Sequence, residues 1–293
     1  MHHLVVTVSL NKFYITVYVL CAVGQVLYTR PQGIDVRGLT LLDNLLYVIR
    51  DKASEQISVF KPDYYRLQRR ISVPQLGDVR DMTACARNHC LYASDSDGYI
   101  HRVALPDVAV TKWPVNDKPA CLSVTDTHSL LVTCDEVRKI KEFTTHGKLL
   151  RQIQLPQNVV SPEHTIQLSS SEFIVCHGDR GEPLHHVCLI GSGGQVVKSY
   201  GGRQGSGRKR MNIPVHMAVD RNGFVFVADA SNCRVLLLSP SLTYVRDVLS
   251  HEQLKWYPFR LFLDDDRRRL YVTENEQERD DEHTAGRIVV IGV

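Results

Sequence analysis

One stretch of this 293-residue chain concentrates positive charge in a form that suits the binding of a polyanion. Residues 201–210 have the sequence GGRQGSGRKR, in which Arg203, Arg208, Lys209 and Arg210 are interspersed with small residues. A guanidinium group contacts phosphate as a fork and an ammonium group contacts it as a point charge. The net charge of +3 for the whole chain permits an acidic partner without requiring one, so the alternative is an ordinary solvated loop.

Binding of single-stranded RNA without strict sequence preference also needs exposed aromatic side chains, on which the bases stack. Few aromatic residues can be assigned to the neighbourhood of this basic tract. The two candidates are Tyr257 and Phe259.

Two further groups of side chains are of metal-ligand type. Between positions 164 and 186 the chain gathers four histidines and a carboxylate: His164, His177, Asp179, His185 and His186. Zinc needs three or four converging ligands, and adjacent residues on a strand project to opposite faces, so the last two histidines cannot easily act together. We therefore expect no metal site there.

The second group is acidic and consists of Glu274, Glu276, Glu278, Asp280, Asp281 and Glu282. Calcium would suit these oxygens, but the regular spacing and the fixed glycine of a calcium loop are missing. We expect a solvated acidic loop, and we expect no cofactor anywhere in the chain.

The eight cysteines have irregular spacings and include no Cys-x-x-Cys motif, and no Asn-x-Ser/Thr glycosylation site is present. These features favour reduced, buried thiols in a cytoplasmic protein over a secreted, disulfide-linked one. The alternative is a cross-strand disulfide, for which the candidate pairs are Cys121 with Cys134 and Cys176 with Cys188.

These residues must be positioned by strands, because short apolar runs of the type L-Y-V-x-D recur along the chain. Their central residues are Tyr47, Tyr92, Val132, Ile174, Phe226 and Tyr271, at intervals of 45, 40, 42, 52 and 45. A four-stranded propeller blade takes about 40–45 residues, and the 3.6-residue period of helical repeats is absent. The sequence predicts an all-β fold: a six-bladed β-propeller with four-stranded antiparallel blades.

The clearest unit spans residues 214–235, PVHMAVDRNGFVFVADASNCRV. Asp220 and Gly223 flank a tight turn, which needs side-chain capping and a permissive backbone. The segment closely resembles an NHL repeat, so the propeller is expected to be of NHL type.

Within that motif, Asp229, Asn232 and Arg234 can tie one loop together through charge-assisted hydrogen bonds. The other units are degenerate at the position of Asp229, where we expect Arg50, Asp95, Asp135, His177 and Glu274. Arg287 in the last unit is the expected counterpart of Arg234.

The last unit lacks a fourth strand, and we expect residues 24–30 to supply it by pairing with residues 287–292, because propellers avoid open sheet edges by combining both chain ends in one blade. The organisation is then an apolar strand segment at 1–23 followed by a single propeller at 24–293. Residues 13–24 are too short to span a bilayer, and their β-branched and aromatic content favours a strand over a signal peptide. A strand at 15–18 would be in excess of the four that a blade needs.

Resemblance to the NHL propellers of tripartite-motif proteins and related ubiquitin ligases implies a non-catalytic recognition scaffold. Its loop face would bind a protein partner, single-stranded RNA or both, with no membrane involved. The RING and B-box of those relatives need paired Cys/His motifs, which this chain lacks, so any role in ubiquitin transfer would depend on another part or partner chain.

The alternative is a metal-dependent lyase or lactonase, because six-bladed relatives of that kind hold a metal in the central channel. Such a site needs polar ligands on the inner strands of several blades. Here those strands are predicted to be mostly apolar, with Asp35 and Asp81 as exceptions, so no catalysis is expected.

Overall fold

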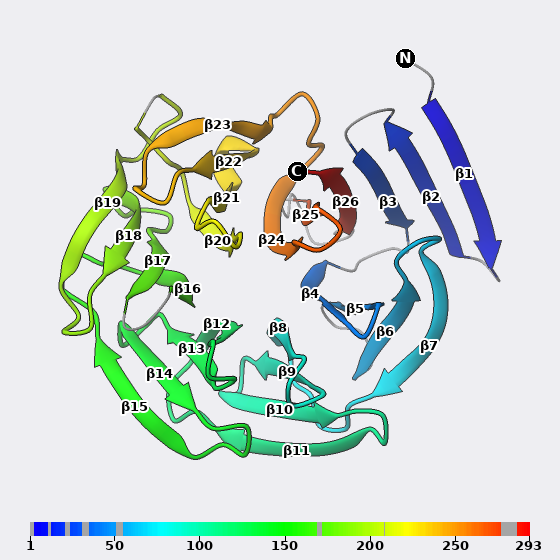
Figure 1. The fold of residues 1–293 in the computed structure, drawn as a ribbon, viewed down its shortest axis with the longest axis horizontal. Coiled ribbons are helices and arrows are strands. Elements are labelled where there is room, and N and C mark those ends of the chain that lie inside the picture. The colour runs from blue at the N-terminus through cyan, green and yellow to red at the C-terminus, as the bar shows by residue number, and fades with distance from the viewer. Residues whose placement is uncertain are drawn as a thin grey trace.

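Six β-sheets are arranged around a central axis in this computed structural model (Figure 1). The structure describes residues 3–10, 13–20, 24–30, 35–50, 55–168, 172–207, 209–276 and 286–293. We call each sheet a blade and number the blades 1–6 in the order of their innermost strands. All neighbouring strands within a blade are antiparallel, so the predicted six-bladed β-propeller is confirmed.

Each of the first five blades contains four consecutive strands. Blade 1 consists of β4 (Val36–Leu42), β5 (Leu45–Arg50), β6 (Gln56–Lys61) and β7 (Arg66–Ser72). Blade 2 consists of β8 (Val79–Cys85), β9 (Cys90–Asp95), β10 (Tyr99–Ala104) and β11 (Ala109–Pro114). Blade 3 consists of β12 (Pro119–Val124), β13 (Leu130–Cys134), β14 (Lys139–Phe143) and β15 (Leu149–Gln154).

Blades 4 and 5 repeat this order, and blade 6 combines both ends of the chain. Blade 4 consists of β16 (Pro162–Gln167), β17 (Phe173–His177), β18 (Leu184–Ile190) and β19 (Val196–Arg203). Blade 5 consists of β20 (Pro214–Val219), β21 (Val225–Asp229), β22 (Arg234–Leu238) and β23 (Tyr244–Leu249), with the short 3₁₀ turn η1 (Ala230–Asn232) after β21. Blade 6 consists of β24 (Tyr257–Asp264), β25 (Arg269–Asn275), β26 (Gly286–Gly292), β3 (Gly24–Arg30), β2 (Phe13–Leu20) and β1 (His3–Leu10).

Burial changes systematically from the axis to the rim. Every residue of β9, β13, β17 and β21, the second strands of blades 2–5, is buried. The outermost strands, such as β15, are largely exposed. Second strands have neighbouring blades against both faces, which is why their sequences are continuous apolar runs rather than alternating ones. The core is therefore a set of layers between blades; one layer joins Ile49 of blade 1 to Met82 and Leu91 of blade 2.

The ring is closed without a covalent link by strands from opposite ends of the chain. β3 pairs with β26, placing Tyr28 opposite Arg287 and Gln25 opposite Val290, as expected from the sequence. β2 and β1 then extend the same sheet outward, so the strand in excess belongs to an enlarged blade 6 (Figure 1).

The strand register corrects one assignment made from the sequence. Asp229 lies opposite Pro214 in blade 5, and in blade 3 the residue opposite Pro119 is Cys134, not Asp135. Asp135 instead begins the tight turn that ends at Arg138, whose backbone N–H donates to the Asp135 carbonyl. The turn ends the strand one residue earlier than the apolar pattern suggested.

Closure by β3 predicts a sharp difference between two truncations. A chain of residues 24–293 keeps the β3–β26 pairing, whereas a chain of residues 31–293 loses it and exposes the edge of β26. We expect the shorter chain to unfold at a temperature lower by about 5 °C or more than the longer one, measured by circular dichroism. Equal unfolding temperatures would show that β3 does not contribute to closure.

Candidate functional site

The loop between blades 4 and 5, which carries the basic tract, is anchored by a buried carboxylate. Asp229, at the end of β21, accepts hydrogen bonds from the backbone N–H of Asn212 at 2.7 Å, from Asn232 Nδ2 at 2.8 Å and from Arg234 Nε at 2.7 Å. Arg234 thereby forms an ion pair with Asp229 while its own side chain is largely buried. Charge-assisted bonds in a buried setting are among the strongest that a side chain makes.

The same side chains also hold the middle of the loop. Asn232 Nδ2 donates to the carbonyl of Gly205 at 3.0 Å, and the Arg234 Nη2 donates to the carbonyl of Arg210 at 2.8 Å. The motif residues therefore fix the backbone on which the basic side chains are mounted. Asp220 has a separate role, because its Oδ1 accepts from the backbone N–H groups of Asn222 and Phe224 and caps the β20–β21 turn. Gly223 in that turn has φ = 81°, in the left-handed region that favours glycine.

Three of the four predicted cations project into solvent from this anchored loop. Arg203 ends β19, and Lys209 and Arg210 follow it; all three side chains are exposed. None of these three forms an ion pair with a described residue, so their charges remain available to a partner. Arg208 lies outside the described residues.

A groove of about 630 Å³ opens beside the basic tract, between the outermost strands of blades 4 and 5. Its lining combines aromatic, aliphatic and cationic side chains, with Tyr200, Lys209, Leu242, Tyr244 and Val245 as the principal contributors. Tyr244 is 40% exposed and Val245 is 44% exposed, which is unusual for side chains of this size. An extended chain with apolar and acidic side chains would match this lining.

The two aromatic residues predicted to stack on bases are not open platforms. Phe259 is half-buried, with the guanidinium of Arg260 4.0 Å and that of Arg37 5.6 Å from its ring centre. Tyr257 is also half-buried and packs against the apolar layer between blades 5 and 6. Neither ring lies in the basic tract or lines the groove.

The axis of the propeller holds a polar cluster that the sequence analysis missed. In blades 1–5, one residue from each innermost strand occupies the same register position, immediately after the irregularity near the start of the strand. These residues are Gly38, Asp81, Cys121, His164 and His216, and their counterpart in blade 6 is Arg260, which lies within the irregularity between Pro258 and Leu261. The inner strands are therefore less apolar than expected. The ring is recognised only when the equivalent positions of all six inner strands are compared, because each blade contributes one residue to it.

Several contacts in this axial ring join Arg260 of blade 6 to blades 1 and 2. Its Nε lies 3.1 Å from Asp81 Oδ1 and 3.1 Å from the carbonyl of Arg37, and its Nη2 donates to the carbonyl of Arg80 at 2.6 Å. Asp81 Oδ2 in turn accepts from the backbone N–H of Leu122 in blade 3 at 2.8 Å. Arg260 and the hydrogen bonds of its environment hold the pKa of the fully buried Asp81 at about 2, against the opposing effect of burial.

Two histidines form further hydrogen bonds between neighbouring blades. The rings of His164 and His216 are stacked, with centroids 3.8 Å apart. The Nδ1 of His164 accepts from the Met217 N–H of blade 5, and the Nδ1 of His216 accepts from the Leu261 N–H of blade 6. Burial lowers the pKa of both imidazoles, so both are neutral and each uses one ring nitrogen to satisfy a backbone group of the next blade.

Glu163 stands next to this ring on β16. Burial raises the pKa of its carboxyl to about 7, while Arg260 acts in the opposite direction and the carboxylates of Asp179 and Asp135 act in the same one. Glu163 is thus the described carboxyl near the axis that changes its charge close to neutral pH.

The predicted acidic loop is only partly described, and its first member does not behave as expected. Glu274 is buried and accepts hydrogen bonds from the backbone N–H groups of Lys255 and Trp256. It also pairs with Arg287, in the register position of the Asp229–Arg234 pair. The expectation that Glu274 is solvated was wrong, and its role is to hold the turn before β24. Residues 278–282 lie outside the described residues.

The histidines of blade 4 separate into three environments. His164 lies in the axial ring, whereas the Nδ1 of His185 accepts from the backbone N–H of Ile213 at the entry to blade 5. His177 and His186 instead lie opposite each other on β17 and β18. Asp179 is exposed and accepts from the backbone N–H of Arg180.

The described cysteines are all free thiols. In blade 4, Cys176 lies opposite Val187 and Cys188 lies opposite Val175, so the two cysteines are offset by one residue and face opposite sides of the sheet. In blade 3 the partner of Cys121 is Thr133, whereas Cys134 lies opposite Pro119. The register therefore explains why neither candidate disulfide pair is joined.

No protein-family model and no curated protein matches the chain. Solved structures do match its fold. Virginiamycin B lyase from Staphylococcus aureus aligns with a TM-score of 0.61 and 10% identity, covering 88% of this chain and 95% of that one. A protein of unknown function from Bacteroides caccae aligns with a TM-score of 0.60 and 14% identity, covering 85% of this chain and 84% of that one. Hydrazine synthase from Kuenenia stuttgartiensis aligns with a TM-score of 0.59 and 12% identity, covering 81% of this chain and 92% of that one.

At these identities the likeness shows the fold alone. The chain is a six-bladed β-propeller. Among the described residues, no helix has the length and apolar character needed to cross a membrane.

The axial ring predicts a large cost for removing its cation. Arg260→Met leaves Asp81 buried without its charged partner, and we expect the free energy of unfolding to fall by about 3–5 kcal/mol in urea titrations. Adding Asp81→Asn should recover part of this loss, because the amide still accepts from Leu122 but carries no charge. Arg221→Met, at an exposed ion pair with Asp265, is the matched control and should cause no measurable change. A single variant as stable as this control would contradict the role given to Arg260.

Glu163 predicts a pH dependence of stability with a definite sign. Because the pKa of this carboxyl is about 7 in the folded chain and near 4.5 when unfolded, the folded state binds more protons between these values, and stability falls as pH rises. Glu163→Gln should remove this fall. The variant should match wild type below about pH 4.5 and exceed it by about 3 kcal/mol above pH 7, in urea titrations across pH. Exposed Glu252→Gln is the control, and a pH-independent difference at Glu163 would contradict the assignment.

Proposed function

We propose that the chain is an NHL-type propeller that acts as a non-catalytic recognition scaffold. Its partner is an extended, acidic segment of another protein, bound along the basic tract at 201–210 and the adjoining groove between blades 4 and 5. The NHL assignment is supported by the motif at 214–235, whose carboxylate, amide and guanidinium anchor the basic loop from beneath.

The observation that carries the proposal is a set of exposed cations, without an ion pair among the described residues, on an anchored loop beside an apolar groove. Arg203, Lys209 and Arg210 offer charge to carboxylates, while Tyr244 and Val245 offer apolar area. A loop whose backbone is already ordered loses little conformational entropy when a partner binds. Electrostatic attraction would then steer the partner, and the groove would supply the contacts that hold it.

Single-stranded RNA is the second candidate, favoured by the exposure of Tyr244 in a groove that also contains Lys209. An exposed tyrosine near a cation can stack a base while the cation contacts phosphate. Against it stands the packing of Tyr257 and Phe259, which leaves no second aromatic platform at the positions predicted for one.

A metal-dependent lyase or lactonase is less well supported by the axial ring. Asp81, Cys121 and His216 offer donor atoms close enough to hold an ion. However, the Arg260 guanidinium lies 3.1 Å from Asp81, and its positive charge opposes the binding of a second cation at the same carboxylate. We therefore assign the axial ring a structural role.

Resemblance to NHL ubiquitin ligases suggests what such recognition would achieve. In that arrangement the propeller selects a protein for ubiquitination, and the ligase chemistry is supplied elsewhere. This part of the proposal rests on the motif resemblance alone.

The test uses two labelled probes, poly-glutamate and oligouridylate, and measures binding by fluorescence anisotropy over a range of KCl concentrations. We expect the wild-type chain to bind poly-glutamate in a salt-dependent manner. The triple variant Arg203→Gln/Lys209→Gln/Arg210→Gln should weaken that binding and flatten its salt dependence. If RNA is the partner, the same variant should reduce the salt slope for oligouridylate by about 2, because each lost phosphate contact contributes about 0.7.

A matched control removes the same charge from another part of the surface. Arg66, Arg69 and Arg70 are exposed cations on β7 of blade 1, and replacing all three with glutamine lowers the net charge equally. Binding should persist in this control. Equal losses in both triple variants, or no binding of either probe by wild type, would overturn the proposed surface.

A further inference from the structure

Three side chains of metal-ligand type lie on one face of blade 4, and none of them belongs to the axial ring or to residues 201–210. His177, at the end of β17, is directly opposite His186 on β18. Cys188 follows two residues later on β18, and residues two apart on a strand project to the same face. The antiparallel register therefore collects two imidazoles and a thiol that are dispersed in the sequence.

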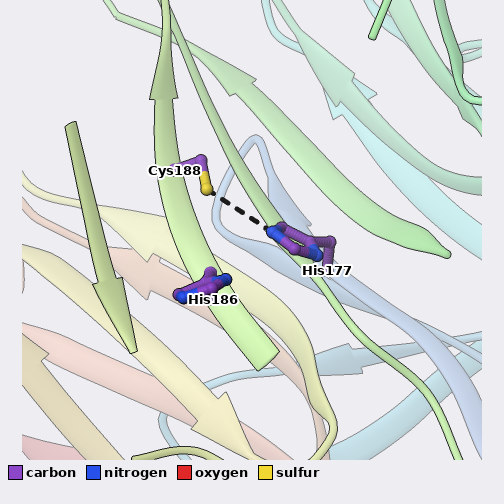
Figure 2. A group of neighbouring side chains, drawn as sticks. All are labelled: His177, His186 and Cys188. Carbon is purple, nitrogen blue, oxygen red and sulfur yellow. Dashed lines mark hydrogen bonds between the residues drawn. The ribbon is translucent and has the colours of Figure 1, made fainter. Parts of the chain in front are cut away.

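Their separations suit a shared ion. One donor atom from each of the three residues lies within 4.8 Å of the other two, and Cys188 Sγ is 3.5 Å from His177 Nε2. A thiolate and an imidazole held by one zinc ion in tetrahedral geometry lie about 3.5 Å apart, given ordinary Zn–S and Zn–N bond lengths. In Figure 2 the side chains of His177 and Cys188 face each other across the two strands, and His186 lies on the same strand as Cys188.

Other blades show what these register positions can hold. In blades 5 and 6 the residues at the positions of His177 and His186 form an ion pair, Asp229–Arg234 and Glu274–Arg287. In blade 2, Asp95 at the position of His177 contacts His101 at the position of Cys188. Blade 4 places His177, His186 and Cys188 at the corresponding positions and has no carboxylate among them. A bound cation with a thiolate ligand would supply in blade 4 the pairing of opposite charges that blades 5 and 6 achieve with side chains alone.

The surroundings favour binding through neutral nitrogen and sulfur. His177 and Cys188 are buried, and His186 is half-buried, which leaves one side open to solvent. Cys188 belongs to the apolar layer shared with blade 3, which also contains Leu155 and Val159. The Nε2 of His177 is the ring nitrogen turned toward Cys188, so it is the atom placed to share an ion with the sulfur.

Zn²⁺ binds neutral imidazole and deprotonated thiol, so each ligand atom must offer a free lone pair to the ion. An ordinary cysteine thiol is protonated near pH 7. Binding of a divalent ion must then break the S–H bond and release one proton to solvent as the metal–sulfur bond forms.

We propose that His177, His186 and Cys188 form a binding site for Zn²⁺. Nε2 of His177, one ring nitrogen of His186 and the thiolate of Cys188 are the three protein ligands. The fourth coordination position faces the open side and takes water or a side chain of a partner. The ion ties β17 to β18 at the loop end of blade 4.

The test uses the full chain after treatment with a chelator. Zn²⁺ is titrated in competition with a chromophoric chelator of micromolar affinity, and Co²⁺ is added separately as a spectroscopic probe. We expect one Zn²⁺ per chain, release of one proton per ion in weakly buffered solution, and thiolate-to-cobalt charge-transfer absorption. Cys188→Ser should abolish that absorption and weaken Zn²⁺ binding by more than about 100-fold, because loss of a second-shell partner alone costs about 10–100-fold.

Two further variants test whether a loss of Zn²⁺ binding in Cys188→Ser comes from loss of the ligand. Cys134→Ser is the matched control, because Cys134 is also fully buried and occupies in blade 3 the position of His177, so it should bind Zn²⁺ as wild type does. His186→Gln replaces the half-buried ligand and covers the case in which Cys188→Ser fails to fold. Absence of Zn²⁺ binding by wild type would overturn the proposal. Binding that survives both ligand variants, or that is lost equally in Cys134→Ser, would also overturn it.

Discussion

The structure depends on how the inner strands of a ring satisfy their unpaired backbone groups. An innermost strand has one sheet neighbour, so its other edge turns toward the next blade with donors and acceptors unmet. Arg260 meets this need for the carbonyls of Arg37 and Arg80 while it pairs with Asp81. Asp81, in turn, satisfies Leu122. A buried ion pair of this kind is stable only because further hydrogen bonds occupy both partners.

In the axial ring and beneath the basic tract, buried charged side chains hold neighbouring segments of the chain together, at different distances from the axis. Near the axis, side chains bridge from one blade to the next; at the loop face, Asp229 and Arg234 bind the connection between blades 4 and 5. In both places a buried charge is fully occupied by structural contacts. The exposed cations on the loop therefore differ in kind from the buried ones, and they are the charges still available to a partner.

Because the blades share one backbone register, the side chains at equivalent positions of different blades can be compared directly. The position that holds Asp95, Asp229 and Glu274 in three blades holds Cys134 in blade 3 and His177 in blade 4. Since the backbone register is shared, the blades differ at this position in the type of side chain and not in the strand backbone that carries it. This is why the change of chemistry in blade 4 is informative, and why Glu274, which resembled a solvated acid in the sequence, is a structural residue.

The number of blades, their antiparallel four-strand plan and the use of residues 24–30 to close the ring could all be predicted from the amino-acid sequence, because these follow from local apolar periodicity and turn residues. The sequence also identified the turn and anchor residues of blade 5, which act within about 25 positions of one another in the chain. Only the tertiary structure brought Arg260 to the carbonyl of Arg80, 180 residues away, and set His177 and His186 on one face with Cys188. Contacts between blades and the exact strand register carry no local signal, since they arise from how complete sheets pack around an axis.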